Sequence, residues 1–417
     1  MNYQLNTEKP RIMWIDLNSA FASAEQQARP SLRGKPIGVT NRVSKECCVI
    51  AASYEAKALG IKVGVRRSEA VALCPDFIML ETDPPKYHYI YKRLLGIMQD
   101  YSPNVRMKSI DEGVIDFHGI PKLEGKQLIK IGKEIKTRIK LEIGDYTRTN
   151  IGIGPNRFLA KTAASLHKPD GLDLIDHRNL VRTFRSLDLQ DLTGIADGYG
   201  SRLRAYNIHT PLEFLQAPEQ LLNKHVFKSI NGTYWYQRLR GYEIDDYETK
   251  LGMVGRQWVV AKPTSDDNYL RSCLHFLAET TGMKLRFRNV EAHGVCVWLR
   301  FRNGDNFIDK KMHKVPFYSN QDIWLRAARL FEKRPKHMII QTMGLYLYKL
   351  TPSTRNQASL FADIEKQDFL TKAIDEINDN YGTFTVYSAD TLTGKQNIKQ
   401  KIPFGGTEYF NLLLKRK

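Results

Sequence analysis

The stretch SIDEGVIDF, Ser109 to Phe117, places two adjacent carboxylates, Asp111 and Glu112, inside an apolar run. Adjacent residues of a strand point to opposite faces of a sheet, so a regular strand could not turn both carboxylates toward a core. Burying either one without a partner would be costly. A divalent cation at a turn or strand edge would give both a counter-charge. The alternative is an acidic hairpin turn in solvent.

Length and charge limit the class of protein. A chain of 417 residues is too long for one hydrophobic core, which predicts about two to four domains. The net charge of +18 indicates a polyanionic partner, most simply nucleic acid, with an acidic membrane surface as the alternative. No apolar run approaches the ~18 residues that span a bilayer, and MNYQLNTEKP is no signal peptide. The five Cys fit no zinc pattern, so we expect free thiols and a cytoplasmic location.

A third carboxylate, Asp16, ends the apolar strand predicted for RIMWIDL (11–17). The stretch NSAFASAEQQARP follows as a predicted helix, with Asn18 or Ser19 as its N-cap. A carboxylate between a strand and a helix N-terminus is a common metal ligand in α/β sheets. Capping of the helix is the alternative role for Asp16.

Two further segments could bind phosphate. Tyr54 and Lys57 lie three residues apart on the short helix predicted for YEAKALG, where they could hold a triphosphate or form a solvated face. Lys161 lies on a helix predicted after the strand and turn of GIGPN (152–156). A helix N-terminus and an ammonium group together suit a phosphate, although GIGPN lacks the GK[ST] ending of a P-loop.

Two later regions could contact DNA. Residues 175–245 are predicted to be mostly helical, and Gly194 and Gly198 lie in a hairpin that resembles a helix-hairpin-helix. Such hairpins bind a DNA phosphate through backbone N–H groups, whereas the alternative is an ordinary corner between helices. Residues 251–352 are predicted to form a β-α-β-β-α-β domain and carry 17 Lys and Arg against 8 Asp and Glu, half of the chain's positive excess.

Within that domain, the stretch WLRFR (298–302) is predicted to place aromatic and basic residues on opposite faces of a strand. Arg300 and Arg302 would then contact the DNA backbone, or simply form a generic solvated sheet face. After Pro352 the chain becomes polar. Its Gln357, Leu360 and Phe361 are typical of a peptide that docks in an apolar groove, or else belong to a linker before the next helix.

Four stretches carry a resemblance to a known family: IDLNSAFASAE (15–25), ASYEAKALGIKVG (52–64), SIDE (109–112) and GIGPNRFLAKTAASLHKPDG (152–171). In this order, with a hairpin motif, a basic C-terminal domain and a clamp-peptide-like QASLF, they resemble the Y-family DNA polymerases, the translesion enzymes that include bacterial polymerases IV and V. The resemblance implies an α+β multidomain fold of the right-hand polymerase type. The implied parts are a palm of mixed sheet and helices (11–22 and 81–178), small fingers (23–80), a helical thumb with helix-hairpin-helix (179–245), a linker (246–255), a β-α-β-β-α-β little finger (256–352) and a tail (353–417).

The resemblance also implies residue roles. Asp16, the Leu17 carbonyl, Asp111 and Glu112 would hold two Mg²⁺ roughly 4 Å apart, with Mn²⁺ as a substitute, and Asp111 would bridge both ions. Phe21 would be the steric gate against a ribose 2′-OH, and Tyr54, Lys57 and Lys161 would contact the triphosphate. Lys57 is Arg in many members, which weakens bidentate phosphate binding, and Ala20 replaces a frequent Phe or Tyr.

The implied activity is template-directed, low-fidelity translesion synthesis without a proofreading exonuclease, within the SOS response to DNA damage. The implied partners of a monomer are primer–template DNA, dNTP and a sliding clamp bound through Gln357 to Phe361; accessory mutagenesis subunits are left open, and no membrane is involved. Two other classes compete. One is a catalytically inactive homologue that acts as a recruitment factor, and the other is a helix-hairpin-helix repair protein or nuclease.

Overall fold

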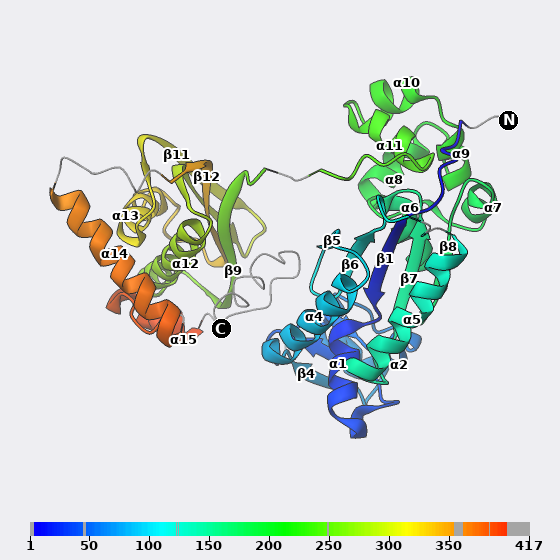
Figure 1. The fold of residues 1–417 in the computed structure, drawn as a ribbon. Coiled ribbons are helices and arrows are strands. Elements are labelled where there is room, and N and C mark those ends of the chain that lie inside the picture. The colour runs from blue at the N-terminus through cyan, green and yellow to red at the C-terminus, as the bar shows by residue number, and fades with distance from the viewer. Residues whose placement is uncertain are drawn as a thin grey trace. The chain divides into compact units, whose positions relative to one another are not determined.

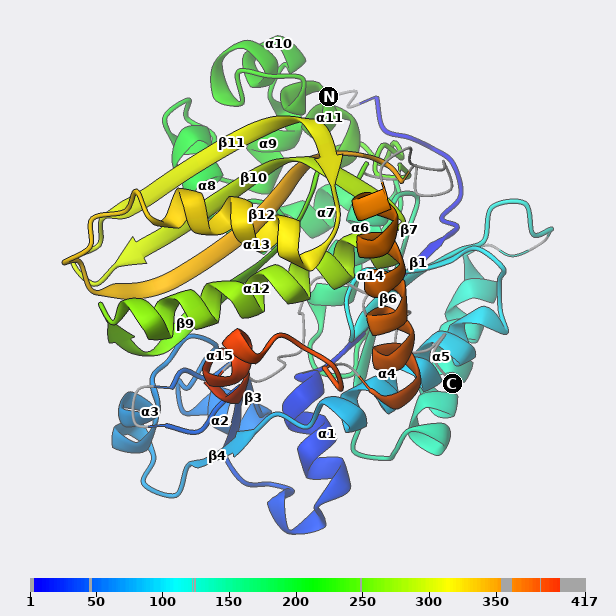
Figure 2. The same ribbon diagram turned by 90° about the vertical axis from the view of Figure 1, so that its left-hand side faces the viewer.

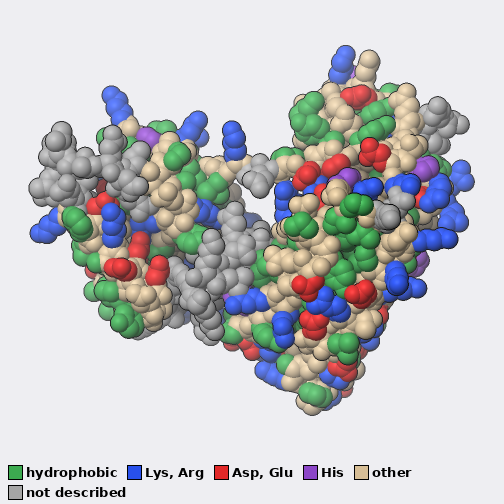
Figure 3. Space-filling model, viewed as in Figure 1, with side chains coloured by type: hydrophobic (Ala, Val, Ile, Leu, Met, Phe, Trp, Pro, Cys, Tyr) green, Lys and Arg blue, Asp and Glu red, His purple; other side chains and the backbone are tan. Residues whose placement is uncertain are grey.

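The computed structural model describes residues 4–44, 47–121, 123, 125–247, 250–353, 362–382 and 384–397. These residues form two compact units, one up to Tyr247 and one from Lys250 to Asn397 (Figure 1). Lys and Arg side chains are spread over the visible face of both units (Figure 3). Within the described ranges, no helix is long and apolar enough to cross a bilayer.

The first unit is built on a five-stranded sheet, in which β1 is central. Its strands, in spatial order, are β5 (Val105–Met107), β6 (Glu112–Asp116), β1 (Ile12–Leu17), β7 (Thr149–Gly154) and β8 (Leu172–Leu174). All neighbours are antiparallel except β7 and β8. One face of this sheet buries Met13, Ile15 and Leu17 against three helices. These helices are α1 (Ala20–Ala28), α4 (Pro84–Gln99) and α5 (Lys126–Glu142).

The other face of this sheet packs against α6 (Arg157–Leu166), which meets Ile12 and Trp14. Two glycines of β7 allow this close approach. A Cβ atom on Gly152 would lie 2.0 Å from the Ala160 carbonyl oxygen, and one on Gly154 would lie 2.6 Å from the Ala160 nitrogen. The glycines of the GIGPN stretch therefore serve helix packing.

A small three-stranded sheet follows β1 and α1 in the chain. It has the order β3-β2-β4, with β2 (Ile37–Thr40), β3 (Ala51–Ala52) and β4 (Ile78–Glu81). The apolar run CCVIAAS thus forms a strand of only two residues. The same region holds a short 3-10 turn and two helices, η1 (Pro30–Leu32), α2 (Tyr54–Ala58) and α3 (Arg67–Leu73).

Residues 180–239 are mostly helical, as predicted for the segment 175–245. They form α7 (Leu180–Arg185), η2 (Leu189–Asp191), α8 (Asp197–Arg204), α9 (Pro211–Gln216), α10 (Glu219–Leu221), η3 (Leu222–Val226) and α11 (Asn231–Leu239). Phe214 and Trp235 lie in their core together with Phe158 of α6. Helix α6 therefore belongs to two cores, and it connects the sheet to the helical segment.

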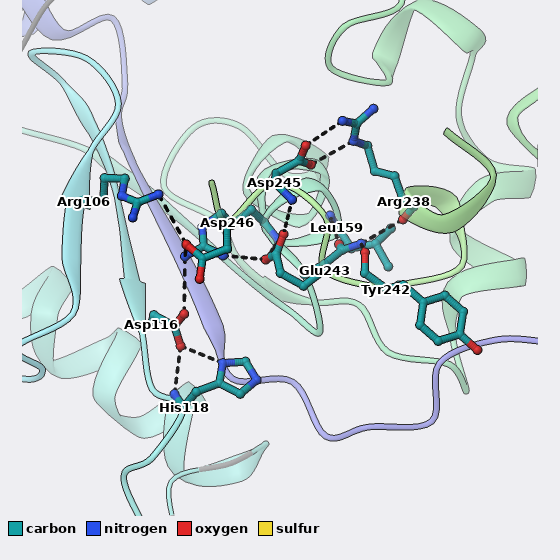
Figure 4. A network of polar contacts seen from close by, with 12 residues as sticks. Arg106, Asp116, His118, Leu159, Arg238, Tyr242, Glu243, Asp245 and Asp246 are labelled. Atoms are coloured by element: carbon teal, nitrogen blue, oxygen red, sulfur yellow. Dashed lines mark hydrogen bonds and ion pairs between the residues drawn. The ribbon is translucent and has the colours of Figure 1, made fainter. Parts of the chain in front are cut away.

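A buried arginine, Arg157, joins the end of this unit to the sheet, in the polar network that includes Asp116, Glu243 and Asp246 (Figure 4). The Arg157 guanidinium lies 2.8 Å from Glu243, 2.7 Å from Asp246 and 3.4 Å from Asp116 of β6. Its side chain is only 6% exposed. Asp246, at the end of this unit, is thereby anchored to the sheet.

The second unit has the predicted β-α-β-β-α-β order. Its elements are β9 (Met253–Thr264), α12 (Asp267–Phe287), β10 (Val290–Phe301), β11 (Asn306–Phe317), α13 (Asn320–Phe331) and β12 (Ile340–Pro352). The four antiparallel strands lie in the order β11-β10-β12-β9. Helices α12 and α13 lie along one face of this sheet (Figure 2) and share its core.

The C-terminal region adds α14 (Ala362–Tyr381), η4 (Ala389–Thr391) and α15 (Leu392–Asn397). Asp375 of α14 accepts two hydrogen bonds from the buried Arg286 side chain, at 2.6 and 2.7 Å. Phe384 stacks near Phe276 of α12 with ring centroids 4.9 Å apart. This part of the sequence, expected to be a tail, is thus packed on the second unit. The groove-binding peptide predicted at Gln357, Leu360 and Phe361 lies outside the described residues.

Candidate active site

Asp16 and Glu112 are direct partners in the antiparallel pair of β1 and β6. Directly opposed residues of two strands point to the same face of a sheet. This is the α6 face, because Trp14 lies two residues before Asp16 and packs toward α6. The Trp14 indole N–H donates to the Glu112 carboxylate at 3.2 Å. Two carboxylates far apart in sequence therefore share one surface beside α6.

Asp111 lies in the turn that precedes β6, so it does not share a regular strand with Glu112. The Ser109 hydroxyl shapes this turn, since it donates to the Asp111 carboxylate at 2.5 Å and accepts the Glu112 amide at 3.1 Å. The Leu17 amide donates to the Asp111 carbonyl at 2.9 Å. The end of β1 and the turn before β6 are thereby joined, which brings all three carboxylates into one neighbourhood.

Two lysines pair with two of these carboxylates. The Lys168 ammonium lies 2.5 Å from Asp16, and the Lys161 ammonium lies 3.0 Å from Glu112. Lys161 also lies 4.7 Å from the centre of the Trp14 ring. Within the described chain, Asp111 forms no salt bridge.

The pKa of Asp111 reflects this lack of a counter-charge. Burial raises the pKa to about 6, and the neighbouring Asp16 and Glu112 charges add to the rise, while the Ser109 hydrogen bond opposes it. Burial likewise raises the pKa of Asp16, against the effect of Lys168. A half-buried carboxylate without a cation, close to two more, belongs to a set of hard oxygen ligands that suits a divalent cation.

The carboxylates do not converge on a single point as they stand. Over the part of the chain that the structure describes, no three His, Cys, Asp or Glu side chains are close enough together to hold a metal ion. The physical reason is that Asp16 and Glu112 turn toward Lys168 and Lys161. A metal ion could be held at this site only if Asp16 released Lys168 and Glu112 released Lys161, so that both carboxylates turned toward the ion.

Phe21 lies on α1, and its ring is buried with 5% exposure. The ring stacks on Tyr87 of α4, with centroids 4.4 Å apart and an interplanar angle of 22°. Tyr87 in turn donates its hydroxyl to the buried Glu25 at 2.8 Å. The ring is therefore held firmly at the end of β1, within five residues of Asp16.

Tyr54 and Lys57 both lie on α2, and Lys57 also contacts Ser19 at the start of α1. The Lys57 ammonium lies 2.7 Å from the Ser19 hydroxyl and 4.7 Å from the centre of the Tyr54 ring. Ser19 is the N-cap residue of α1, one of the two predicted, but its backbone is left-handed with φ of 49° and its side chain makes no capping bond. Burial and the nearby Lys168 charge lower the pKa of Lys57. The structure thus gathers Lys57, Lys161 and Lys168 around the carboxylates.

Lys161 is the fifth residue of α6, away from the amide groups of the helix N-terminus. The Arg157 amide donates to Glu243 at 3.0 Å, and the Leu159 amide donates to the Asn156 side chain at 2.8 Å. The interpretation of this helix N-terminus as a phosphate site was wrong, because a carboxylate of the chain itself already occupies it. Lys161 instead contacts the site through its side chain, whose ammonium pairs with Glu112.

The two predicted DNA-binding regions lie apart from this site in the sequence. Gly194 has a left-handed φ of 100° in the loop between η2 and α8, and Gly198 is the second residue of α8, with open space around it. Arg300 and Arg302 are exposed at the end of β10. The predicted separation of aromatic and basic residues was wrong for Trp298. Trp298 shares the face of Arg300, while Leu299 and Phe301 are buried on the other face.

Sequence reasoning missed Lys168, the role of Ser109 and the contact of Ser19 with Lys57. Lys168 pairs with Asp16 across 152 residues, and no spacing in the sequence connects them. Ser109 does stand in the SIDE stretch, two residues before Asp111, where a hydroxyl commonly hydrogen-bonds a nearby backbone amide. That pattern could have identified its role in shaping the turn.

Known proteins of one family match this chain. Residues 15–165 match the impB/mucB/samB family, and residues 253–360 match the C-terminal domain of that family. DNA polymerase IV of Moorella thermoacetica is 31% identical over 398 residues, which are 92% of this chain and 96% of the relative. DNA polymerase IV 1 of Bacillus subtilis is 28% identical over 405 residues, or 94% of this chain and 96% of the relative.

Solved structures show the same fold. A Y-family polymerase chimera of Dbh and Dpo4 superposes with a TM-score of 0.72 at 22% identity, covering 82% of this chain and 99% of that one. An insertion ternary complex of Dbh DNA polymerase has a TM-score of 0.55 with the same identity and coverage. The comparisons define a DNA-directed DNA polymerase of the right-hand fold. The chain belongs to the impB/mucB/samB family, the Y-family of translesion DNA polymerases.

The predicted family and fold class are thereby confirmed. In the terms of this fold, the five-stranded sheet is the palm sheet, and the four-stranded sheet with α12 and α13 is the C-terminal sheet domain.

Proposed function

We propose that this chain extends a primer 3′ end on template DNA with low fidelity, including across damaged positions, and that Asp16, Asp111 and Glu112 form its catalytic centre. The observation that carries the proposal is the register of Asp16 with Glu112, beside a half-buried Asp111 that has no counter-charge among the described residues. The carboxylates and the Leu17 carbonyl would hold two divalent ions, Mg²⁺ with Mn²⁺ as a substitute. Bound there, the ions supply activation of the 3′-hydroxyl and neutralisation of the phosphates.

The reaction joins the primer 3′-oxygen to the α-phosphorus of the dNTP and breaks the bond to pyrophosphate. Lys161 and Lys57 add positive charge where negative charge develops on the phosphates. Lys161 and Lys168 now pair with Glu112 and Asp16, so with divalent ions bound at these carboxylates the Lys161 ammonium would be free to contact the triphosphate. Tyr54 lies against Lys57 and limits where its ammonium can point.

Phe21 selects deoxyribonucleotides in this proposal, because a fixed aromatic ring beside the sugar leaves no room for a 2′-hydroxyl. Its stacking on Tyr87 and its burial support a rigid gate. Ala20 on the same helix is smaller than the Phe or Tyr of many family members, so we expect a looser fit on the sugar side. No exonuclease is proposed, so primer ends are not edited.

Primer–template DNA is the proposed macromolecular partner. The structure of Dbh as an insertion ternary complex supports this assignment. The hairpin of Gly194 and Gly198 would bind a backbone phosphate, and Arg300 and Arg302 would do the same from the little finger. We retain the predicted domain boundaries, with the palm at 11–22 and 81–178, the fingers at 23–80, the thumb at 179–245 and the little finger at 256–352.

A sliding clamp is the proposed partner of Gln357, Leu360 and Phe361, on the grounds of their sequence alone. The experiment that tests the function is primer extension with Mg²⁺ on undamaged and abasic templates, with and without a clamp. We expect extension on both templates, no shortening of the primer when dNTP is omitted, and stimulation by the clamp. Binding of primer–template without extension would favour the inactive recruitment factor.

A further inference from the structure

Arg148 is a half-buried cation that lies directly before β7, at the same end of the sheet as the carboxylates. The next residue, Thr149, pairs with Leu17 of β1. The Arg148 carbonyl accepts the Asn18 amide at 2.9 Å, so the backbone of this residue is fixed beside the end of β1. Its guanidinium forms no salt bridge with any residue that the structure describes. Because a guanidinium keeps its proton in proteins, this charge is permanent and open to an anion from outside the chain.

The Tyr146 ring supports the Arg148 side chain. The guanidinium carbon lies 5.7 Å from the centre of that ring. The Tyr146 hydroxyl donates to Glu55 at 3.1 Å and accepts the Gly34 amide at 3.2 Å, while the Tyr146 amide donates to Gln27 at 2.8 Å. The ring is therefore held at its hydroxyl and at its backbone. A guanidinium on such a ring is restrained in position and still has N–H groups to offer a ligand.

The contact between Tyr146 and Glu55 brings Arg148 to helix α2. Glu55 follows Tyr54 directly on this helix, where Tyr54 lies against the Lys57 ammonium. Burial raises the pKa of Tyr54 to about 12, the charge of Asp16 adds to the rise, and the charge of Arg148 opposes it. The Tyr54 hydroxyl thus lies within electrostatic reach of a site carboxylate and of Arg148, which assigns Arg148 to the same site.

The cations around Tyr146 differ in their counter-charges. Arg33 also stacks on the Tyr146 ring, 5.1 Å from its centre, but Asp145 neutralises it at 3.1 Å. Among the residues that the structure describes, neither Arg148 nor Lys57 forms a salt bridge. Two such cations beside a phosphate-transfer site suit a polyanion. Lys57 offers it a point charge, whereas Arg148 offers a planar fork of N–H groups that matches two phosphate oxygens.

We propose that Arg148 binds the triphosphate of the incoming dNTP through its guanidinium, as a further phosphate ligand beside Lys57 and Lys161. Tyr146 is its positioning residue. The inference rests on the proposed DNA synthesis, because that reaction brings a triphosphate to the carboxylates. It differs from contact with the base or the sugar, for which a charged fork has no particular advantage.

The test is equilibrium binding of a fluorescent dNTP to the full chain with Mg²⁺ and a primer–template whose primer ends in a dideoxynucleotide, so that no bond can form. Unlabelled pyrophosphate then competes, since it has phosphates but no base or sugar. Arg148→Met should weaken binding of both the dNTP and pyrophosphate at least about tenfold, with primer–template affinity within about twofold of wild type. Arg148→Lys, which keeps the charge but not the fork, should weaken both by about threefold.

Arg93→Met is the matched control, because Arg93 also stacks on a tyrosine, 5.8 Å from the centre of the Tyr89 ring. It should bind both ligands as wild type does. Unchanged dNTP binding in Arg148→Met would overturn the proposal, and so would weaker dNTP binding with unchanged pyrophosphate binding, which would assign Arg148 to the base or sugar. Should the Met variant fail to fold, the Lys variant gives the same decision. Primer extension by wild type, run in parallel, separates failure of this inference from failure of the proposed synthesis.

Discussion

Asp16 and Glu112 face each other across the β1–β6 pair, and each holds a lysine, Lys168 at 2.5 Å and Lys161 at 3.0 Å. The lysines supply the positive charge that these neighbouring carboxylates require. Asp111 completes the group but has no such partner among the described residues. This unequal distribution of counter-charge leads to a prediction about pH.

The metal-free protein should lose stability as pH rises through the titration of Asp111. Its folded-state pKa of about 6 lies above the ordinary 3.8, so the folded protein binds the proton more tightly between about pH 4 and about pH 6. Asp111→Asn should therefore raise the free energy of unfolding above pH 6 by up to about 3 kcal/mol, with no gain near pH 4. Urea unfolding in EDTA at several pH values measures this difference. A variant no more stable than wild type at pH 8 would contradict the assignment.

Phe21→Ala should raise ribonucleotide incorporation. Removing the ring that stacks on Tyr87 opens space beside the sugar, and we expect the ratio of rNTP to dNTP use to rise at least about tenfold. Single-nucleotide insertion kinetics measure the ratio. Tyr87→Phe is the control, since it keeps the stacked ring and loses only the bond to Glu25. Equal rNTP use by wild type and Phe21→Ala would exclude the gate.

Arg157→Met should destabilise the first unit strongly. The substitution leaves Glu243, Asp246 and Asp116 without their shared cation, and removal of one partner from a buried ion pair costs about 3–5 kcal/mol. Arg106→Met is a matched control, because Arg106 pairs with the same Asp246 at 3.3 Å but is 39% exposed. Its cost should stay below about 1 kcal/mol in urea unfolding. Similar losses in the free energy of unfolding for both variants would contradict the claim that burial makes the Arg157 ion pairs more stabilising than the exposed pair of Arg106.

Leu360→Ala with Phe361→Ala should reduce clamp-stimulated synthesis and leave basal synthesis unchanged. Substitution is preferable to deletion, because α14 begins at Ala362 and follows directly. An apolar pair that docks in a groove loses its main contact area when both side chains are truncated. Processivity with and without clamp measures the effect, with Ser359→Ala as the control. A fall in basal synthesis would assign these residues a structural role instead.

The sequence predicted the elements of the palm and the little finger well, because their strands and helices have strong apolar periodicity. It predicted Asp16, Asp111 and Glu112 as site candidates from residue type and family resemblance. It did not predict Lys168, because a contact across 152 residues depends on tertiary structure. It also misplaced Trp298, which lies two residues before Arg300 and therefore shares its face of the strand.

The role of the N-terminus of α6 could not be predicted for the same reason. A turn with glycines before a helix is typical of phosphate sites, but here Gly152 and Gly154 are needed for helix packing. The anion at the helix end is Glu243, from the far end of the unit. The local sequence pattern predicts helix α6, whereas contacts with residues far away in the sequence determine what its N-terminus binds.

The central claim is that the three carboxylates perform catalysis. Its most direct test is the rate of single-nucleotide extension by Asp111→Ala with Glu112→Ala, compared with Asp145→Asn at an exposed carboxylate. We expect the double variant to lose at least about a thousandfold in rate, while primer–template affinity stays within about twofold and Asp145→Asn extends normally. Extension by the double variant at the wild-type rate would contradict the account.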